Sequence, residues 1–212
     1  MSADVQSQSS GDSAPTAVLD SALNRIDEWV GKDLKYSEIG GGITNHNYLI
    51  TVDEGRGGKY VLRIPGVGSD TFIDRERERG NHASAAEAGA SPPVLYTLQP
   101  EAITVVPFIA GETMHPETLA GHRGRLEKVV DVIRAYHDKA TFSNDTNAFM
   151  MIRRYMEMAK NVNAWFPADW SRIMRLGEEI ERAMGRDVPR RVACHNDLLS
   201  ENFILDQDDR MW

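Results

Sequence analysis

The stretch His195-Asn196-Asp197-Leu198-Leu199-Ser200-Glu201-Asn202 lies near the end of the 212-residue sequence and places a carboxylate and an amide five positions apart. Apolar residues flank it, so the pattern predicts a polar loop between two short strands, Arg191–Cys194 and Phe203–Leu205. A carboxylate at Asp197 can orient and deprotonate a hydroxyl group, and the side-chain oxygen of Asn202 can hold a metal ion. Phosphoryl transfer needs these two functions in one cavity and little covalent chemistry from the protein.

His195, Asp197, Leu198 and Asn202 match the kinase signature His-Arg-Asp-Leu-x-x-x-Asn in register, with Asn196 in place of the arginine. Such a match arises by chance in on the order of one sequence in a thousand. The alternative interpretation is a polar turn in which the acid and the amide only cap backbone groups. We interpret His195 as a hydrogen-bonding residue of the loop, and Cys194 as a small buried residue.

Composition excludes several classes of protein. The net charge of -8 argues against nucleic-acid binding, which relies on Lys and Arg. No apolar run approaches the ~20 residues that span a bilayer, and the N-terminus lacks the layout of a secretory signal. The single cysteine excludes an intrachain disulfide and fits a reducing, cytoplasmic location. Residues 1–15 are rich in Ser, Asp, Gln and Gly and are predicted to form a disordered tail.

The remaining sequence divides into a β-rich half and a helical half. Apolar periodicity predicts one helix over residues 17–30 and another over 72–88, the second started by Ser69 or Asp70. Strands are predicted over residues 36–39, 47–52, 59–64, 94–98 and 102–109, and three helical stripes follow Gly111. The pattern alone predicts an α+β fold.

Four upstream strings add to the loop. They are Gly40-Gly41-Gly42-Ile43-Thr44-Asn45-His46-Asn47-Tyr48, Tyr60-Val61-Leu62-Arg63-Ile64-Pro65-Gly66, the I-x-R-x-x-E-x-x-N pattern of residues 73–81, and Val105-Val106-Pro107-Phe108-Ile109-Ala110-Gly111. Together they resemble the choline/ethanolamine kinase family, whose bacterial members belong with the aminoglycoside phosphotransferases in the protein-kinase-like superfamily. The resemblance covers roughly residues 35–205.

This resemblance implies a bilobal protein-kinase-like fold, with an N-lobe over residues 16–107 that contains one inserted helix. Residues 108–212 would form an incomplete, mainly helical C-lobe. ATP and Mg²⁺ are the implied cofactors. The implied roles are phosphate binding by Gly41, Gly42, Thr44, Asn45 and Arg63, pairing of Glu78 with Arg63, adenine binding by Pro107, Phe108 and Ile109, catalysis by Asp197, and Mg²⁺ binding by Asn202.

Each implied role has a plainer alternative. The glycine cluster can be a hairpin turn, Arg63 an exposed residue of a strand edge, and the charged run Glu76–Arg79 a solvated helix face. His137, Trp165 and Trp170 are interpreted as packing residues rather than ligand-binding ones.

The family also carries a second acidic motif, with an Asp that binds Mg²⁺, which counting from Asn202 would place just past Trp212. We therefore expect the chain as given to be truncated and to have little or no activity alone. The expected parent function is ATP-dependent phosphorylation of a small alcohol, choline or ethanolamine first, without nucleic-acid partners. The alternatives are an aminoglycoside or thiamine kinase-like enzyme and a catalytically silent nucleotide-binding protein. The acceptor and the oligomeric state stay open.

Overall fold

The computed structural model describes residues 13–40, 45–53, 57–66, 73–143, 145–185 and 191–212. These residues form two compact units, one extending to Thr141 and including Ala193–Trp212, the other spanning Phe142–Val192. Most of the predicted tail lies outside the described residues, and helix α1 (Ser13–Leu23) begins within its last three positions. The predicted lobe boundary between residues 107 and 108 stays a prediction.

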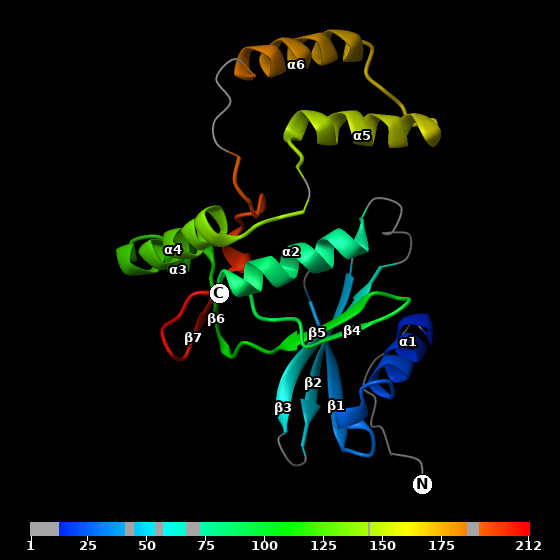
Figure 1. Cartoon of the computed structure of the whole chain (residues 1–212), viewed down its shortest axis with the longest axis vertical. Helices are drawn as coiled ribbons and strands as arrows, with labels where there is room; N and C mark the ends of the chain where they lie inside the picture. Colours follow the sequence, from blue (N-terminus) through cyan, green and yellow to red (C-terminus); the bar gives the residue numbers. More distant parts are fainter. Residues whose placement is uncertain (1–12, 41–44, 54–56, 67–72, 144, 186–190) are drawn as a thin grey trace. The chain divides into compact units, whose positions relative to one another are not determined.

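A five-stranded antiparallel sheet dominates the first unit (Figure 1). Its strands are β1 (Leu34–Ile39), β2 (Asn45–Val52), β3 (Gly58–Pro65), β4 (Tyr96–Leu98) and β5 (Ile103–Pro107), in the order β1-β2-β3-β5-β4. All five correspond to strands that the β-prone runs of the sequence predict. Since successive side chains alternate between the faces of a strand, the pairing register determines which residues share a face.

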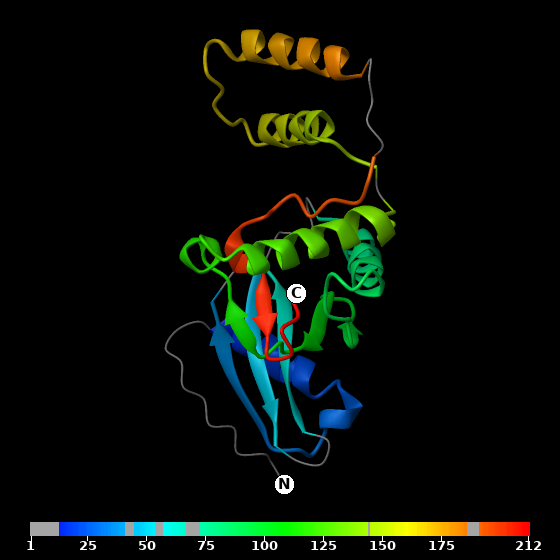
Figure 2. The ribbon, with the colours of Figure 1, turned by 90° about the vertical axis from the view of Figure 1, so that its left-hand side faces the viewer.

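One face of this sheet carries the larger hydrophobic core. Ile50, Leu62 and Val105 are fully buried there, with Leu19 of α1 packed into the same cluster. Trp29, in the 3-10 turn η1 (Asp27–Trp29), extends the cluster towards Tyr60. The predicted helix over residues 17–30 is therefore replaced by α1 and this turn. Figure 2 shows α1 beside the sheet in the side view.

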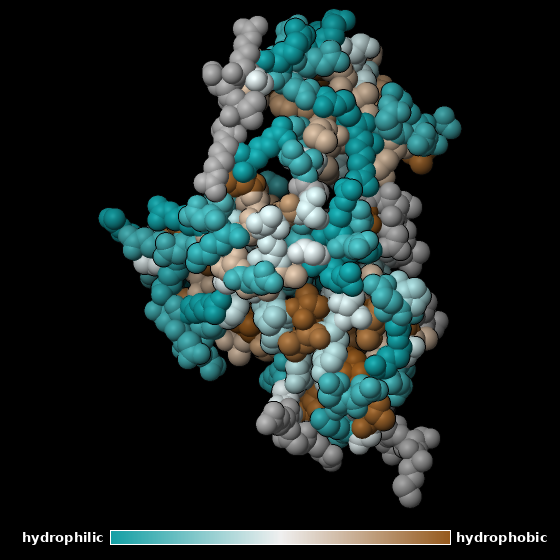
Figure 3. Space-filling view, viewed as in Figure 1, coloured by the Kyte–Doolittle hydropathy of each residue, from teal (hydrophilic) through white to brown (hydrophobic). Residues whose placement is uncertain are grey.

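The opposite face carries a second, less buried row. Leu49 pairs with Val61, and Val61 pairs with Val106, so these three half-buried apolar residues lie side by side on β2, β3 and β5. Two residues further along β3, Arg63 lies on the same face, and its cross-strand partner is Thr104. In Figure 3, hydrophobic residues are visible over the region of the sheet, whereas α3 and α4 present mostly hydrophilic ones.

Helix α2 (Arg75–Glu87) follows β3. Its N-cap is Asp74, whose carboxylate accepts a hydrogen bond of 3.1 Å from the Arg77 N–H. The prediction that Ser69 or Asp70 starts this helix is wrong, because Asp74 satisfies one of the free amides of the first turn.

A small two-stranded sheet holds the loop His195–Asn202 in place. Strand β7 (Ile204–Asp206) pairs with β6 (Gly111–Thr113), and the loop ends in the 3-10 turn η3 (Ser200–Asn202) just before β7. Helices α3 (Pro116–Leu119) and α4 (Arg123–Lys139) follow β6. Met114, Val132, Phe203 and Met211 form a second buried core in this region.

The predicted strand Arg191–Cys194 is wrong. Residues 191–199 have irregular backbone. Both edges of β7 are already paired, one with β6 and the other through two backbone hydrogen bonds between Ile204 and Trp212. Without an available strand edge beside it, an apolar segment does not become a strand.

The second unit contains α5 (Ala148–Asn161) and α6 (Trp170–Met184), which confirm two of the three predicted helical stripes. A two-pronged ion pair between Arg153 and Glu181, with nitrogen–oxygen distances of 2.6 and 2.9 Å, joins these helices. None of the described helices is both long and apolar enough to cross a membrane.

Candidate active site

The loop His195–Asn202 holds the backbone of Asp197 from two sides. The Asp197 N–H donates to Nδ1 of His195 at 3.3 Å, and Nδ2 of Asn202 donates to the Asp197 carbonyl at 2.9 Å. The Asp197 side chain itself is exposed to solvent. The two hydrogen bonds therefore fix the backbone position from which the Asp197 side chain extends, and they leave its carboxylate accessible to a substrate.

Asn196 gives the loop its sharp turn. Its φ of 62° lies in the left-handed region, which asparagine tolerates better than most residues, and its side-chain amide donates to the Cys194 carbonyl at 3.4 Å. His195 packs edge-on against Tyr136 of α4, with ring centroids 5.8 Å apart. These contacts agree with a hydrogen-bonding and packing role for His195.

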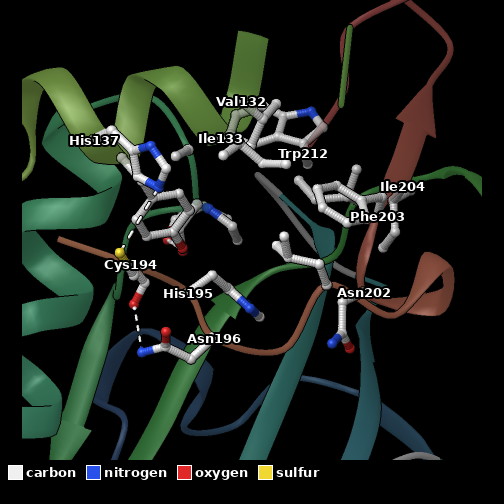
Figure 4. Close-up of a pocket in the computed structure, with 16 residues that line it drawn as sticks. Val132, Ile133, His137, Cys194, His195, Asn196, Asn202, Phe203, Ile204 and Trp212 are labelled. Carbon is white, nitrogen blue, oxygen red and sulfur yellow. Dashed lines mark hydrogen bonds between the residues drawn. The ribbon is translucent and has the colours of Figure 1, made fainter. Parts of the chain in front are cut away.

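A cavity of about 350 Å³ lies beside the loop (Figure 4). Two predicted site residues line it, Ile109 of the connector after β5 and Asn202. His195, Asn196 and Asn202 lie along one side of the cavity in Figure 4, opposite Val132 and Ile133 of α4 and Trp212. Asp197 is not among its lining residues. The cavity therefore brings the predicted adenine-binding connector next to the predicted metal ligand.

A second pocket, called the arginine-rich pocket from here on, is lined by another part of the predicted site. Asn45, Arg63 and Glu78 line it together, from β2, β3 and α2. Arg75 and His82 of α2 line it too, and Nη1 of Arg75 is 2.7 Å from Oε2 of Glu78. The pairing of Arg63 with Glu78 stays a prediction, although both residues face the same pocket. Gly41, Gly42 and Thr44 lie outside the described residues.

The charge around this second pocket is positive on balance. Three arginines, at positions 63, 75 and 79, surround one carboxylate. Burial lowers the pKa of His82 below the ordinary value of 6.5, which favours its neutral form. The Pro92 carbonyl raises this pKa, Arg63 lowers it and Glu78 raises it, each by less than burial lowers it. An excess of arginine guanidinium groups favours binding of a polyanion such as a chain of phosphates.

The backbone hydrogen bonds of the connector after β5 show which of the three predicted adenine-binding residues has an N–H left to donate. Pro107 has no N–H, and the Phe108 N–H donates to the Lys59 carbonyl at 2.9 Å. Among the described residues, nothing accepts a hydrogen bond from the Ile109 N–H. Of the three predicted residues, Ile109 is thus the one whose N–H is left unbonded by the described residues.

Comparison with known proteins agrees with this geometry. The model of the phosphotransferase enzyme family, APH, matches residues 35–211. The chain belongs to this phosphotransferase family.

Individual relatives are similar to this chain over most of its length. Protein LicA of Haemophilus influenzae is 31% identical over 186 residues, which cover 84% of this chain and 52% of LicA. The solved structure of a choline/ethanolamine kinase family protein from Mesorhizobium loti aligns with a TM-score of 0.72 and 30% identity, over 93% of this chain and 63% of that one. A structure of LicA in complex with AMP aligns with a TM-score of 0.71 at 20% identity, over 91% and 66% of the two chains.

This chain therefore spans about half the length of the curated LicA protein that it matches. The structural matches confirm the predicted α+β, protein-kinase-like fold.

The residues of the loop fit a magnesium ion. Because Nδ2 of Asn202 is engaged by the Asp197 carbonyl, Oδ1 is the atom of this amide that remains for a cation. Mg²⁺ prefers oxygen ligands and is commonly held by one or two side chains together with substrate phosphates. Among the described residues there is no group of three or more His, Cys, Asp or Glu side chains that could hold a metal alone. Within the loop, the fit thus rests on Asn202.

Sequence reasoning assigned no site role to three residues that line the arginine-rich pocket, Arg75, Arg79 and His82. Arg75 and His82 lie on the face of α2 that carries Glu78, three positions before it and four positions after it. This helical spacing was the available signal, although spacing alone does not show that the face is turned towards Arg63.

Proposed function

We propose that the protein is an ATP-dependent phosphotransferase that transfers the γ-phosphate to the hydroxyl group of a small alcohol. The observation that carries this proposal is the loop in which Asp197 is held at both backbone atoms while its carboxylate stays exposed. An exposed, fixed carboxylate can accept the proton of an incoming hydroxyl group.

The remaining residues supply nucleotide binding. The apolar row Leu49, Val61 and Val106 offers a surface for the flat adenine ring, with the Ile109 N–H as a hydrogen-bond donor at the end of β5. Arg63 lies on the same face of the sheet, nearer the arginine-rich pocket, where its guanidinium can bind phosphate oxygens. A bound Mg²⁺ would neutralise charge on the triphosphate, and Asn202 would hold it.

Choline or ethanolamine is the proposed acceptor. The support is the similarity to LicA and to the choline/ethanolamine kinase family protein from Mesorhizobium loti, together with the Gly-Gly-x-Thr-Asn and Val-Leu-Arg-Ile-Pro-Gly strings. Aminoglycosides and thiamine are the other acceptors to compare, since the family is broad in substrate.

The test is Asp197→Asn in the full-length protein. Removing the carboxylate should lower the rate of acceptor phosphorylation by about 10²- to 10⁴-fold, because general-base catalysis contributes that much, while ATP binding is retained. Asp138→Asn, an exposed aspartate of α4, is the matched control and should leave both unchanged.

Turnover would be measured with choline, ethanolamine, thiamine and an aminoglycoside. An unchanged rate in Asp197→Asn would remove this residue from the mechanism. ATP binding without turnover on any of these acceptors would instead favour a catalytically silent nucleotide-binding protein.

A further inference from the structure

His82 connects the arginine-rich pocket to the cavity beside the loop. It lies on α2 four residues after Glu78, and its ring lines the pocket that contains Arg63 and Glu78. Its Nε2 is 3.0 Å from the carbonyl oxygen of Pro92. Pro92 in turn lines the cavity that contains His195 and Asn202. One hydrogen bond thus joins His82, a residue of the arginine-rich pocket, to Pro92 in the wall of the cavity beside the loop.

The chemistry of this bond defines the state of the histidine. A carbonyl oxygen can only accept a hydrogen bond, so Nε2 must carry a proton. In the neutral ring Nδ1 is then the unprotonated nitrogen. The burial that lowers the pKa of His82 favours this neutral form at pH 7, so His82 adds little to the positive charge of the three arginines in the pocket.

We propose that His82 is a positioning residue, which through its hydrogen bond to Pro92 sets the place of Glu78 relative to Arg63 and to the loop His195–Asn202. This role rests on the proposed function, because it concerns the alignment of phosphate-binding side chains with the reacting groups. Residues at i and i+4 share one face of a helix, so a shift of α2 at His82 moves Glu78 with it.

Other hydrogen bonds of α2 provide a matched comparison. Ser84 Oγ accepts a bond of 2.7 Å from the Thr141 N–H, and the Gly89 carbonyl just after the helix accepts one of 2.9 Å from Arg210. Neither Ser84 nor Gly89 lines the arginine-rich pocket. Ser84→Ala therefore loosens the same helix without touching the site.

The experiment compares His82→Leu, His82→Gln and Ser84→Ala in the full-length protein. His82→Leu introduces an apolar side chain of similar reach that cannot donate a hydrogen bond. The KM for ATP should therefore rise about three- to tenfold, the effect of losing roughly one hydrogen bond. His82→Gln presents an amide donor near the former Nε2 and should restore KM to within about twofold. Ser84→Ala should lower the melting temperature while leaving this KM unchanged.

The outcomes separate the positioning role from the proposed function. If Arg63→Met weakens ATP binding but His82→Leu behaves like Ser84→Ala, the positioning role is overturned and the phosphotransferase function stands. If glutamine fails to rescue while leucine is impaired, ring packing and not the hydrogen bond is responsible, which also overturns the role. If the unsubstituted protein binds no ATP, both ideas fall.

Discussion

Asn196 shows how a single backbone angle shapes the candidate active site. With φ at 62°, it reverses the chain between Cys194 and Asp197. A Cβ that is branched clashes with the carbonyl in this region, whereas glycine and asparagine enter it at little cost. The asparagine that stands in place of the arginine of the kinase signature therefore also lowers the energetic cost of this left-handed backbone conformation.

We expect Asn196→Val to lower the free energy of unfolding by about 1–2 kcal/mol relative to Asn196→Gly, the cost of a left-handed conformation for a branched residue. Urea unfolding of both variants measures this difference. Equal stability of the two would mean that the loop relaxes to another conformation, and the hydrogen bonds to Asp197 would then have to be re-examined.

Among the secondary structure elements, β6 depends on the absence of a side chain at one position. A Cβ added at Gly111 would lie 2.8 Å from the carbonyl carbon of Leu205, closer than real contacts allow, and the neighbour is backbone that cannot rotate away. Glycine lets β6 and β7 approach, and β7 in turn follows directly on the turn that contains Asn202.

Gly111→Ala should therefore destabilise the protein by about 1–3 kcal/mol, as overpacking does, and should weaken metal-dependent activity along with it. The control is Gly124→Ala in α4, where an added Cβ meets nothing within 4 Å. That change should stabilise by about 0.5–1 kcal/mol, since alanine favours helix. Thermal unfolding of the two variants should give shifts of opposite sign.

Helix α2 should make stability depend on pH through His82. Its pKa in the folded protein is lowered, first by burial and then by Arg63, against the opposing effects of the Pro92 carbonyl and Glu78. The unfolded chain then binds a proton more readily than the folded one, so this contribution is fully present above pH 6.5 and is lost as the pH falls below it.

His82→Gln should remove this part of the pH dependence, so that its unfolding free energy changes less between pH 7.5 and 5.5 than that of the unsubstituted protein. Chemical unfolding at both pH values measures it. A steeper dependence in the variant would show that His82 is stabilised in its charged form.

At the scale of the whole molecule, the second unit exposes an apolar stripe on α6. Large apolar side chains on α6 are accessible, and Ile180 and Met184 are 54% and 57% exposed. Ile173 and Leu176 extend the same apolar stripe of α6. A contiguous apolar face of this kind marks a site of association or aggregation.

A protein of residues 1–212 should therefore bind a hydrophobic dye. Ile180→Lys should reduce the dye signal with little change in the melting temperature, because more than half of this residue is exposed to solvent. Leu62→Ala, in the core of the sheet, is the contrasting variant and should lower the melting temperature while raising the dye signal. Dye binding that is unaffected by Ile180→Lys would place the exposed surface elsewhere.

The fold and the loop were largely predictable from local patterns. The predicted catalytic residue Asp197 and the predicted metal ligand Asn202 lie within eight contiguous positions, so their relation is a matter of one short loop. The five strands followed from β-prone runs and turn residues, which act over a few positions. Three predictions were wrong: the strand Arg191–Cys194, the start of α2 and the single helix over residues 17–30. Pairing, capping and helix length depend on which partners are available and not on propensity alone.

Distant contacts account for what the sequence did not reveal. Arg75 and His82 join Arg63 in one pocket only because α2 turns that face towards β3. The Phe108 N–H is unavailable to a ligand only because β3 lies beside it. Local sequence determines which residues a segment contains and what it tends to form. Which atoms of separate segments meet depends on register and packing, because these are settled by the simultaneous burial of many side chains far apart along the chain.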